Sequence, residues 1–217
     1  MTELWLVRHG ETEWNRLRRV QGTLDIGLNA LGRVQADRVA VRFRPGQPAV
    51  HAVYSSDLAR ARDTARPTAA RLGLEIRLDA GLRERRYGVF EGLSFDELAE
   101  RHPEAARAVR ERHPDYELEG GESLRQFHQR VVATLDRIAA GHAGQRVLVF
   151  THSGVLDAAY RHAQGLPLRA ERRHSLHNVS INRLVAEQGA WRVDGWGDVA
   201  HLEGSQQDAW EEPADAA

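Results

Sequence analysis

Short apolar runs alternate with helical stretches along most of this chain, and that alternation limits the fold more than any other feature. The runs are rich in strand-forming residues and end at polar or glycine-containing turns. They cover residues 3–7, 49–54, 75–78, 146–150, 179–187 and 190–196. Helical stretches separate the first four, which predicts parallel strands, and the tight Gln188-Gly189 turn predicts a terminal antiparallel hairpin. We therefore expect an α/β three-layer sandwich, with a mostly parallel mixed sheet and helices on both faces.

Capping residues mark where several predicted helices begin. Asn29 precedes one apolar stripe, and Ser94 with Glu97 matches the capping box, in which each side chain satisfies a backbone N–H of the other residue. Pro67 is expected to kink or interrupt its helix. The stretch 94–121 should form a small helical lid inserted into the fold. Helices are predicted over residues 30–43, 58–72, 95–102, 105–112, 124–140 and 154–164.

Length and composition indicate one globular domain. The chain has 217 residues, of which 41% are hydrophobic and 28% are charged, as expected for a chain with one sizeable core. We expect a single domain over residues 1–203. Residues 204–217 are acidic and alanine-rich, and we expect them to form a disordered tail.

Composition also excludes several classes of function. The chain has no cysteine, which excludes disulfides, cysteine zinc sites and thiol catalysis. It has no lysine either, which excludes the lysine-containing loop of P-loop nucleotide enzymes. A formal net charge of -1 gives no reason to expect a nucleic acid or a membrane as partner. No signal-peptide pattern or membrane-spanning apolar run is visible, so a cytoplasmic location is expected.

Two predicted strands that lie far apart in the sequence each end in a histidine-containing turn. The first ends in Arg8-His9-Gly10 and the second in His152-Ser153-Gly154. A single histidine at a strand end is more often a hydrogen-bonded structural residue. Ligands of parallel sheets, however, bind beyond the carboxyl ends of the strands, where these two turns would meet. Together with Arg8, the pair makes a binding site about as plausible as a structural role.

The ordered set of motifs around these turns resembles the histidine phosphatase superfamily, the phosphoglycerate-mutase-like proteins. A lone Arg-His-Gly would be weak evidence, but the whole set follows the family's order and spacing over roughly the first three-quarters of the chain. The set comprises Leu6-Val-Arg-His-Gly-Glu-Thr-Glu-Trp-Asn15, Gln21-Gly22, Asp25, Ser55-Ser-Asp-Leu-Ala-Arg60-Ala, Thr64-Ala65, Leu82-Arg-Glu84, Tyr87-Gly88, Gly121-Glu-Ser123 and Thr151-His152-Ser-Gly154.

The resemblance implies a chemical role for each charged residue of the set. His9 would be the nucleophile that forms a phosphohistidine, and nearby positive charge would keep its ring unprotonated. Arg8, Arg60 and His152 would bind the phosphoryl oxygens, with His152 protonated when phosphate is bound. Glu84 would protonate the leaving oxygen and then activate water, its pKa raised by the bound phosphate.

Other acidic and polar residues leave alternatives open. Glu11 and Glu13 lie nearer His9 in sequence, and the preference for Glu84 as the acid rests on the resemblance alone. Asn15 is either a donor in the pocket or a helix cap. The remaining residues that the resemblance assigns to substrate binding are Gln21, Gly22, Tyr87 and Ser153.

No metal site or cofactor is expected. His174 and His177 are three residues apart and could share a helical face, but they precede a predicted strand and lack carboxylate partners at ligand spacing. We interpret both as surface histidines. The expected partner is a small phosphomonoester, and a homodimer is one assembly that the sequence allows.

The sequence favours hydrolysis over phosphoryl transfer back to the substrate. Phe95 stands where the cofactor-dependent mutases carry a substrate-binding lysine, and Arg110-Glu111-Arg112 does not clearly reproduce their arginine pair. The segment Leu82-Arg-Glu-Arg-Arg-Tyr-Gly88 is nevertheless similar to the mutases, so a cofactor-dependent phosphoglycerate mutase is the alternative. A binding module without catalysis is disfavoured because nucleophile and acid are both present. The physiological substrate stays open at this stage.

Overall fold

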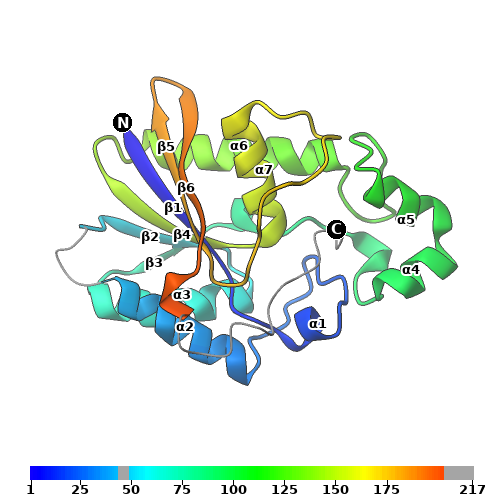
Figure 1. Ribbon diagram of the computed structural model, residues 1–217, viewed down its shortest axis with the longest axis horizontal. Helices are drawn as coiled ribbons and strands as arrows, with labels where there is room; N and C mark the ends of the chain where they lie inside the picture. Colours follow the sequence, from blue (N-terminus) through cyan, green and yellow to red (C-terminus); the bar gives the residue numbers. More distant parts are fainter. Residues whose placement is uncertain (44–48, 203–217) are drawn as a thin grey trace.

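A six-stranded sheet runs through the centre of the protein in a computed structural model that describes residues 1–43 and 49–202 (Figure 1). The strand order is β3-β2-β4-β1-β5-β6. The pairs β1–β4, β2–β4 and β2–β3 are parallel, whereas β5 is antiparallel to both β1 and β6. The strands are β1 (Thr2–Arg8), β2 (Ala52–Ser55), β3 (Ile76–Leu78), β4 (Arg146–Thr151), β5 (Ile181–Glu187) and β6 (Ala190–Asp198).

Helices cover both faces of the sheet. In Figure 1, α2 and α3 lie below the strands, and α6 and α7 lie above them. The bounds are α1 (Glu13–Arg16), α2 (Ala30–Arg42), α3 (Ala59–Leu72), α4 (Phe95–Arg101), α5 (Pro103–Arg110), α6 (Leu124–Ala140) and α7 (Ser153–Gln164). The predicted α/β three-layer sandwich with a mostly parallel mixed sheet is confirmed.

The two central strands have side chains in both hydrophobic layers because successive side chains of a strand point to opposite faces. Leu4 and Leu6 of β1 pack in the layer with α6 and α7. Val7 of β1, with Leu148 and Phe150 of β4, packs in the layer with α2 and α3. All five side chains are fully buried. This two-sided burial fixes the register of β1 against β4, and therefore the positions at which both strands end.

A small helical segment, drawn in green at the right of Figure 1, lies beyond the carboxyl ends of the strands. Its helices α4 and α5 have a hydrophobic cluster of their own, which includes Phe90, Leu98, Ala105 and Leu118. The segment matches the helical insertion that the sequence predicted. Its proposed role as a lid is taken up below.

Two of the predicted helices differ from prediction, those that contain Pro67 and Pro103. Pro67 was expected to kink or interrupt its helix, but α3 continues as one helix past it. Thr64, Ala65, Thr68 and Ala69 are buried around this proline, and that packing outweighs one missing hydrogen bond. The short helix α1 was not predicted.

A second difference concerns α5, which starts two residues earlier than expected. Pro103 occupies its first turn, where a missing backbone N–H costs nothing. No helix among the described residues is long and apolar enough to span a membrane. The single domain over residues 1–203 stays a prediction, and the predicted disordered tail lies outside the described residues.

Candidate active site

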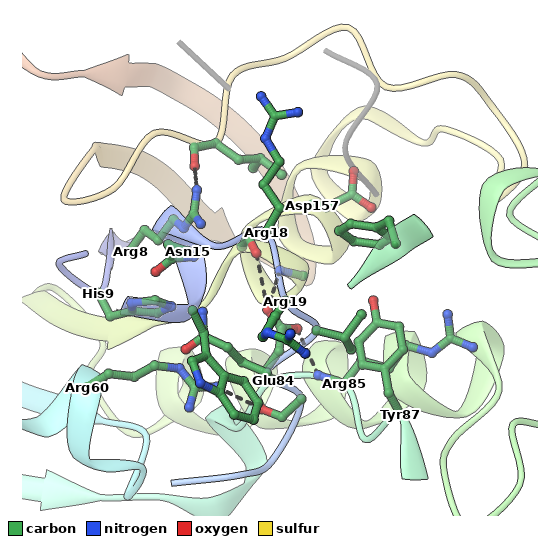
Figure 2. Close-up of a pocket in the computed structure, with 18 of the residues that line it drawn as sticks. Arg8, His9, Asn15, Arg18, Arg19, Arg60, Glu84, Arg85, Tyr87 and Asp157 are labelled. Atoms are coloured by element: carbon green, nitrogen blue, oxygen red, sulfur yellow. Dashed lines mark hydrogen bonds between the residues drawn. The ribbon is translucent and has the colours of Figure 1, made fainter. Parts of the chain in front are cut away.

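A cavity of about 530 Å³ opens at the carboxyl ends of β1 and β4, between the sheet and the green helical segment (Figures 1 and 2). Figure 2 shows Arg8, His9 and Arg60 on one side of it, and Arg85 and Tyr87 on the other. The predicted site residues that line this cavity are Arg8, His9, Asn15, Gln21, Gly22, Arg60, Glu84, Tyr87 and Ser153. His152 is fully buried and is not part of the lining.

His9 follows the last residue of β1 and has a defined tautomer. Its backbone N–H bonds to the carbonyl of Thr151 at 2.9 Å, which continues the β1–β4 ladder. Its ring Nδ1 lies 2.7 Å from the carbonyl oxygen of Gly10, so Nδ1 donates and Nε2 keeps a free lone pair. Burial, Arg60 and Arg8 together hold the pKa of His9 well below its usual value of 6.5. The ring is therefore neutral and nucleophilic at physiological pH.

Two buried arginines lie beside His9. Arg60 on α3 is fully buried and donates to the backbone carbonyls of Gly22 and Leu24 at 2.7 and 2.8 Å. Burial lowers the pKa of Arg60 to about 10 in spite of the nearby Glu84, so the guanidinium is still charged at neutral pH. Arg8 donates to the backbone carbonyl of Leu176. Both cations raise the local potential where a phosphoryl group would bind.

His152 is buried against His9, with ring centroids 5.2 Å apart. Burial, Arg60, His9 and Arg8 hold the pKa of His152 well below 6.5, so the expected protonated ring does not describe the free protein. Its Nε2 lies 2.9 Å from the hydroxyl of Ser56, and its Nδ1 has no hydrogen-bond partner among the described residues. If the Ser56 hydroxyl donates to Nε2, then Nδ1 carries the proton and can donate to a phosphoryl oxygen as a neutral ring.

Glu84 has its carboxyl oriented by three donors. Its Oε1 accepts from the backbone N–H of Arg85 at 2.7 Å. Its Oε2 accepts from the backbone N–H of Gly154 at 3.0 Å and from the hydroxyl of Ser153 at 3.2 Å. These last two residues begin α7, directly after His152. The turn that carries one predicted phosphate ligand thus also holds the predicted acid.

The other two candidate acids have different surroundings. Oε1 of Glu11 accepts from the side-chain amide of Asn29 at 2.5 Å, which ties this buried carboxyl to the start of α2. Glu13 is exposed and pairs with Arg16 along α1. Of the three carboxyls, the one on Glu84 is bound at the turn that follows His152, which favours it as the acid.

Asn15 is a helix cap that also lines the cavity. Its Oδ1 accepts from the backbone N–H and the hydroxyl of Thr12, which completes the capping box of α1. The side-chain oxygen is thereby fixed, and Nδ2 is the donor that the residue can offer to a ligand. Asn15 thus takes part in capping α1, as the partner of Thr12, and its role as a donor to a ligand stays a prediction.

Gln21 and Gly22 shape the wall opposite α3. Gln21 is buried, and its Oε1 accepts from the hydroxyl of Thr12 at 3.0 Å. Gly22 contributes the backbone carbonyl that holds Arg60. Gly22 thus fixes the position of a predicted phosphate ligand, whereas the contact of Gln21 is with Thr12 at the start of α1.

Aromatic and aliphatic side chains line part of the cavity. Arg85 lies over the ring of Tyr87 at 5.2 Å, and burial raises the pKa of that phenol, so its hydroxyl stays a donor. Phe95 occupies the position of the mutases' lysine and presents an apolar side chain. The apolar lining residues are Trp14, Val20, Phe95, Val109, Leu124, Phe127 and Leu176. These apolar side chains share the lining with eight arginines, Arg8, Arg16, Arg18, Arg19, Arg60, Arg85, Arg112 and Arg172, so the cavity is strongly cationic.

The interpretation of His174 as a surface residue is wrong. Its side chain is 5% exposed, stacks on Tyr160 with centroids 4.0 Å apart, and places Nε2 3.1 Å from Oδ1 of Asp157. Asp157 also pairs with Arg161 and Arg112. The sequence offered no signal for this cluster, because its carboxylate lies on α7 and its histidine lies in the loop before β5.

Asn178 is a site residue that the sequence did not reveal. Its side-chain amide donates to the backbone carbonyl of His9 at 2.8 Å, and it lines the cavity. Only the antiparallel pairing of β5 with β1 brings residue 178 beside residue 9. No group of three or more histidine, aspartate or glutamate side chains that could hold a metal ion occurs in residues 1–43 and 49–202.

Comparisons with known proteins agree with this geometry. A family model described as histidine phosphatase superfamily (branch 1) matches residues 4–199. Phosphoglycerate mutase-like protein 4 of Arabidopsis thaliana is 43% identical over 204 residues, which span 93% of this chain and 87% of that protein. The metal-independent phosphoserine phosphatase of the same plant is 41% identical over 204 residues, 93% of this chain and 84% of that protein. Bacillus stearothermophilus YhfR superposes with a TM-score of 0.87 at 32% identity, covering 94% of this chain and 100% of that chain.

Proposed function

The chain belongs to the histidine phosphatase superfamily, and on that basis we propose that it hydrolyses a small phosphomonoester through a phosphohistidine on His9. It is a metal-independent phosphatase, like the phosphoserine phosphatase among its relatives. The observation that carries the assignment to His9 is its ring geometry. Nδ1 donates to Gly10 while Nε2 keeps a lone pair beside two arginines.

In the first step, Nε2 of His9 attacks phosphorus and the ester P–O bond breaks. Arg8, Arg60 and His152 stabilise the charge that spreads over the non-bridging oxygens. Glu84 gives its proton to the departing oxygen, so an alcohol leaves instead of an alkoxide. The products of this step are the free alcohol and an N–P bond on His9.

In the second step, water replaces the alcohol. The Glu84 carboxylate takes one proton from a water molecule, whose oxygen attacks phosphorus. The N–P bond breaks and its electron pair returns to Nε2, which restores the neutral ring. Inorganic phosphate then leaves, and Glu84 has regained the proton that it donated in the first step.

The cavity favours a small metabolite as the substrate. Its volume of about 530 Å³ suits a molecule of metabolite size, and its eight arginines favour an anionic substrate such as a phosphomonoester. Phosphoserine is the first compound to test, because a relative at 41% identity is named as a phosphoserine phosphatase. The helical segment over residues 94–121 would act as the lid that selects among phosphomonoesters.

A cofactor-dependent phosphoglycerate mutase is the second candidate, favoured by the name of the 43% identical relative. Phe95 and Arg112 count against it. Phe95 offers no charge to a substrate, and Arg112 is engaged by Asp157. Isomerisation of phosphoglycerate that depends on 2,3-bisphosphoglycerate would establish the mutase.

The central experiment measures hydrolysis of an aryl phosphate and of phosphoserine in the presence of EDTA. Wild-type protein should hydrolyse these esters. His9→Ala should not, since it lacks the nitrogen atom that attacks phosphorus. His51→Ala, which removes an exposed histidine far from the cavity, is the control and should keep full activity. A phosphoenzyme that is labile in acid should form in the wild type and be absent from His9→Ala. Retained turnover in His9→Ala would refute the mechanism.

We further propose a cytoplasmic location and leave the homodimer as a hypothesis. A chain without cysteine is compatible with a reducing compartment. Fractionation of the source cells tests the location, and light scattering on the purified protein tests the assembly.

A further inference from the structure

The segment that carries Glu84 has little regular secondary structure of its own. A single 3-10 turn, Ala80–Leu82, precedes it, and residues 83–87 belong to no helix or strand. An irregular backbone with buried carbonyl groups needs hydrogen-bond donors from elsewhere. In this protein many of them come from one arginine on α6, Arg130.

All five N–H groups of Arg130 find acceptors. Nη1 donates to the carbonyl oxygens of Gly81 and Arg83 at 2.9 and 3.0 Å. Nη2 donates to the carbonyl oxygen of Glu84 at 3.2 Å. Three of the five donors thus bind the backbone at and just before the predicted acid.

The other two donors of Arg130 bind Glu122 side-on. Nε lies 2.9 Å from Oε1 and Nη2 lies 2.9 Å from Oε2 of that carboxylate. Both side chains are largely buried, with 26% and 12% of their area exposed. Such a two-bond contact fixes the plane of the guanidinium as well as its position.

Glu122 also binds the far end of the same segment. Its Oε2 accepts from the backbone N–H of Arg86 at 3.2 Å, and its backbone N–H donates to the carbonyl of Arg86 at 2.8 Å. Its own carbonyl accepts from the guanidinium of Arg85 at 2.9 and 3.0 Å. Arg130 and Glu122 therefore hold the backbone on both sides of Glu84.

We propose that the Arg130–Glu122 pair is a positioning device for the general acid, and that its loss weakens proton transfer to the leaving group. The inference rests on the proposed role of Glu84. Neither partner touches the substrate in this scheme, and neither lines the cavity. Both act through the backbone that sets where the Glu84 carboxyl lies.

Arg130→Lys is the informative variant because it keeps the charge. A lysine has three donors on one nitrogen, so it cannot bind Glu122 side-on and reach three carbonyls at once. Arg125→Lys is the matched control, because Arg125 lies on the same helix and also binds a carboxylate side-on, that of Asp115. The Arg125–Asp115 pair is exposed and contributes little to folding stability.

The readout is the dependence of kcat/KM on the leaving group. An aryl phosphate expels a stable phenolate and needs little help from an acid, whereas an alkyl phosphate such as phosphoserine needs a proton. Glu84→Gln should slow the alkyl ester by roughly 10²- to 10⁴-fold and the aryl ester far less. Arg130→Lys should show the same selectivity with a loss of roughly 10- to 100-fold, and Arg125→Lys should show none.

The double variant tests whether both residues act in one step. If Arg130 acts through Glu84, then Arg130→Lys in the Glu84→Gln background should cause no further selective loss. Glu122→Gln leaves the Arg130 side chain intact but weakens the side-on contact that orients it. It therefore gives the same test if Arg130→Lys fails to fold. Its selective loss should be smaller than that of Arg130→Lys.

The outcomes separate the two claims. If Glu84→Gln slows both esters equally, the acid assignment of Glu84 is wrong and the inference is overturned with it. If Glu84→Gln is selective while Arg130→Lys and Glu122→Gln affect both esters equally or not at all, only the inference is overturned. Selective losses in all three variants support both claims.

Discussion

The backbone N–H of Gly154 donates a 3.0 Å hydrogen bond to Oε2 of Glu84. Gly154 lies in the first turn of α7, and Glu84 lies in an irregular segment 70 positions earlier in the chain. The helix start that follows His152 therefore orients the proposed acid. A substitution at position 154 should therefore lower the rate of catalysis, although glycine itself has no side chain.

Gly154→Ala should impair catalysis far more than folding. A Cβ at this position would overlap Oε1 of Glu84 and lie 3.1 Å from Cζ of Phe127, so the carboxyl must move. We expect kcat for an alkyl phosphate to fall by roughly 10- to 1000-fold, within the range of a displaced general acid.

The control for this variant is Gly141→Ala, at the C-terminal end of α6. A Cβ there would have no neighbour nearer than 3.6 Å and no unusual backbone angle, so activity should be unchanged. The measurements are steady-state kinetics and thermal unfolding of both variants. Wild-type kinetics in Gly154→Ala would contradict the assigned position of Glu84.

Folding stability should fall as the pH drops below 6.5. The pKa of His9 and that of His152 are held well below 6.5 in the folded protein, chiefly by burial. The unfolded chain binds protons at these rings near pH 6.5, while the folded chain does not, so acid favours unfolding. Each ring should contribute a loss of roughly 1 kcal/mol between pH 7.5 and pH 5.5.

Urea unfolding at the two pH values measures this effect. The pH-dependent loss should shrink by roughly 1 kcal/mol in His9→Gln and again in His152→Gln, because glutamine does not titrate. An unchanged pH dependence in both variants would mean that these rings are protonated in the folded state. That result would remove the basis for a neutral nucleophile.

Asp157→Asn should destabilise the fold. Burial alone would raise the pKa of Asp157, but His174, Arg112 and Arg161 together hold it well below its usual range. The variant leaves the fully buried Arg161 without its counter-charge, which in comparable buried pairs costs about 3–5 kcal/mol. Asp194→Asn is the control, since Asp194 pairs with arginines at the surface and should cost less than about 1 kcal/mol. Equal unfolding free energies for the two variants would show that the Asp157 cluster adds no stability.

The sheet and its principal helices could be predicted because their signals are local. Apolar runs predict the strands β1 and β4. The capping residues Asn29 and Ser94 predict the helices that begin directly after them. Pro67 misled the prediction because its effect depends on the packing around α3, which a local pattern does not contain.

The same distinction between local signals and long-range packing applies to the residues of the site. Arg8, His9, Arg60 and Glu84 were predicted because their motifs match a family, and the structure places all four on one cavity. Asn178 and the buried His174 were missed or misread, because strand pairing and loop packing bring them to their partners. Glu84 was preferred among three candidate acids from the resemblance alone, and the structure adds that its carboxyl binds the turn after His152.

The two ends of the helical segment with α4 and α5 are joined to each other. Val89 donates to the carbonyl of Glu119, and Glu122 donates to the carbonyl of Arg86, so backbone hydrogen bonds join the two ends. The segment buries its own apolar side chains around Phe90 and Leu98. A gene that exchanged this segment for that of a relative could thus change which alcohol is released while keeping the machinery that breaks the P–O bond. Such an exchange would leave the sheet unchanged, but it would have to preserve the contacts of Glu97 with Arg19 and of Arg112 with Asp157.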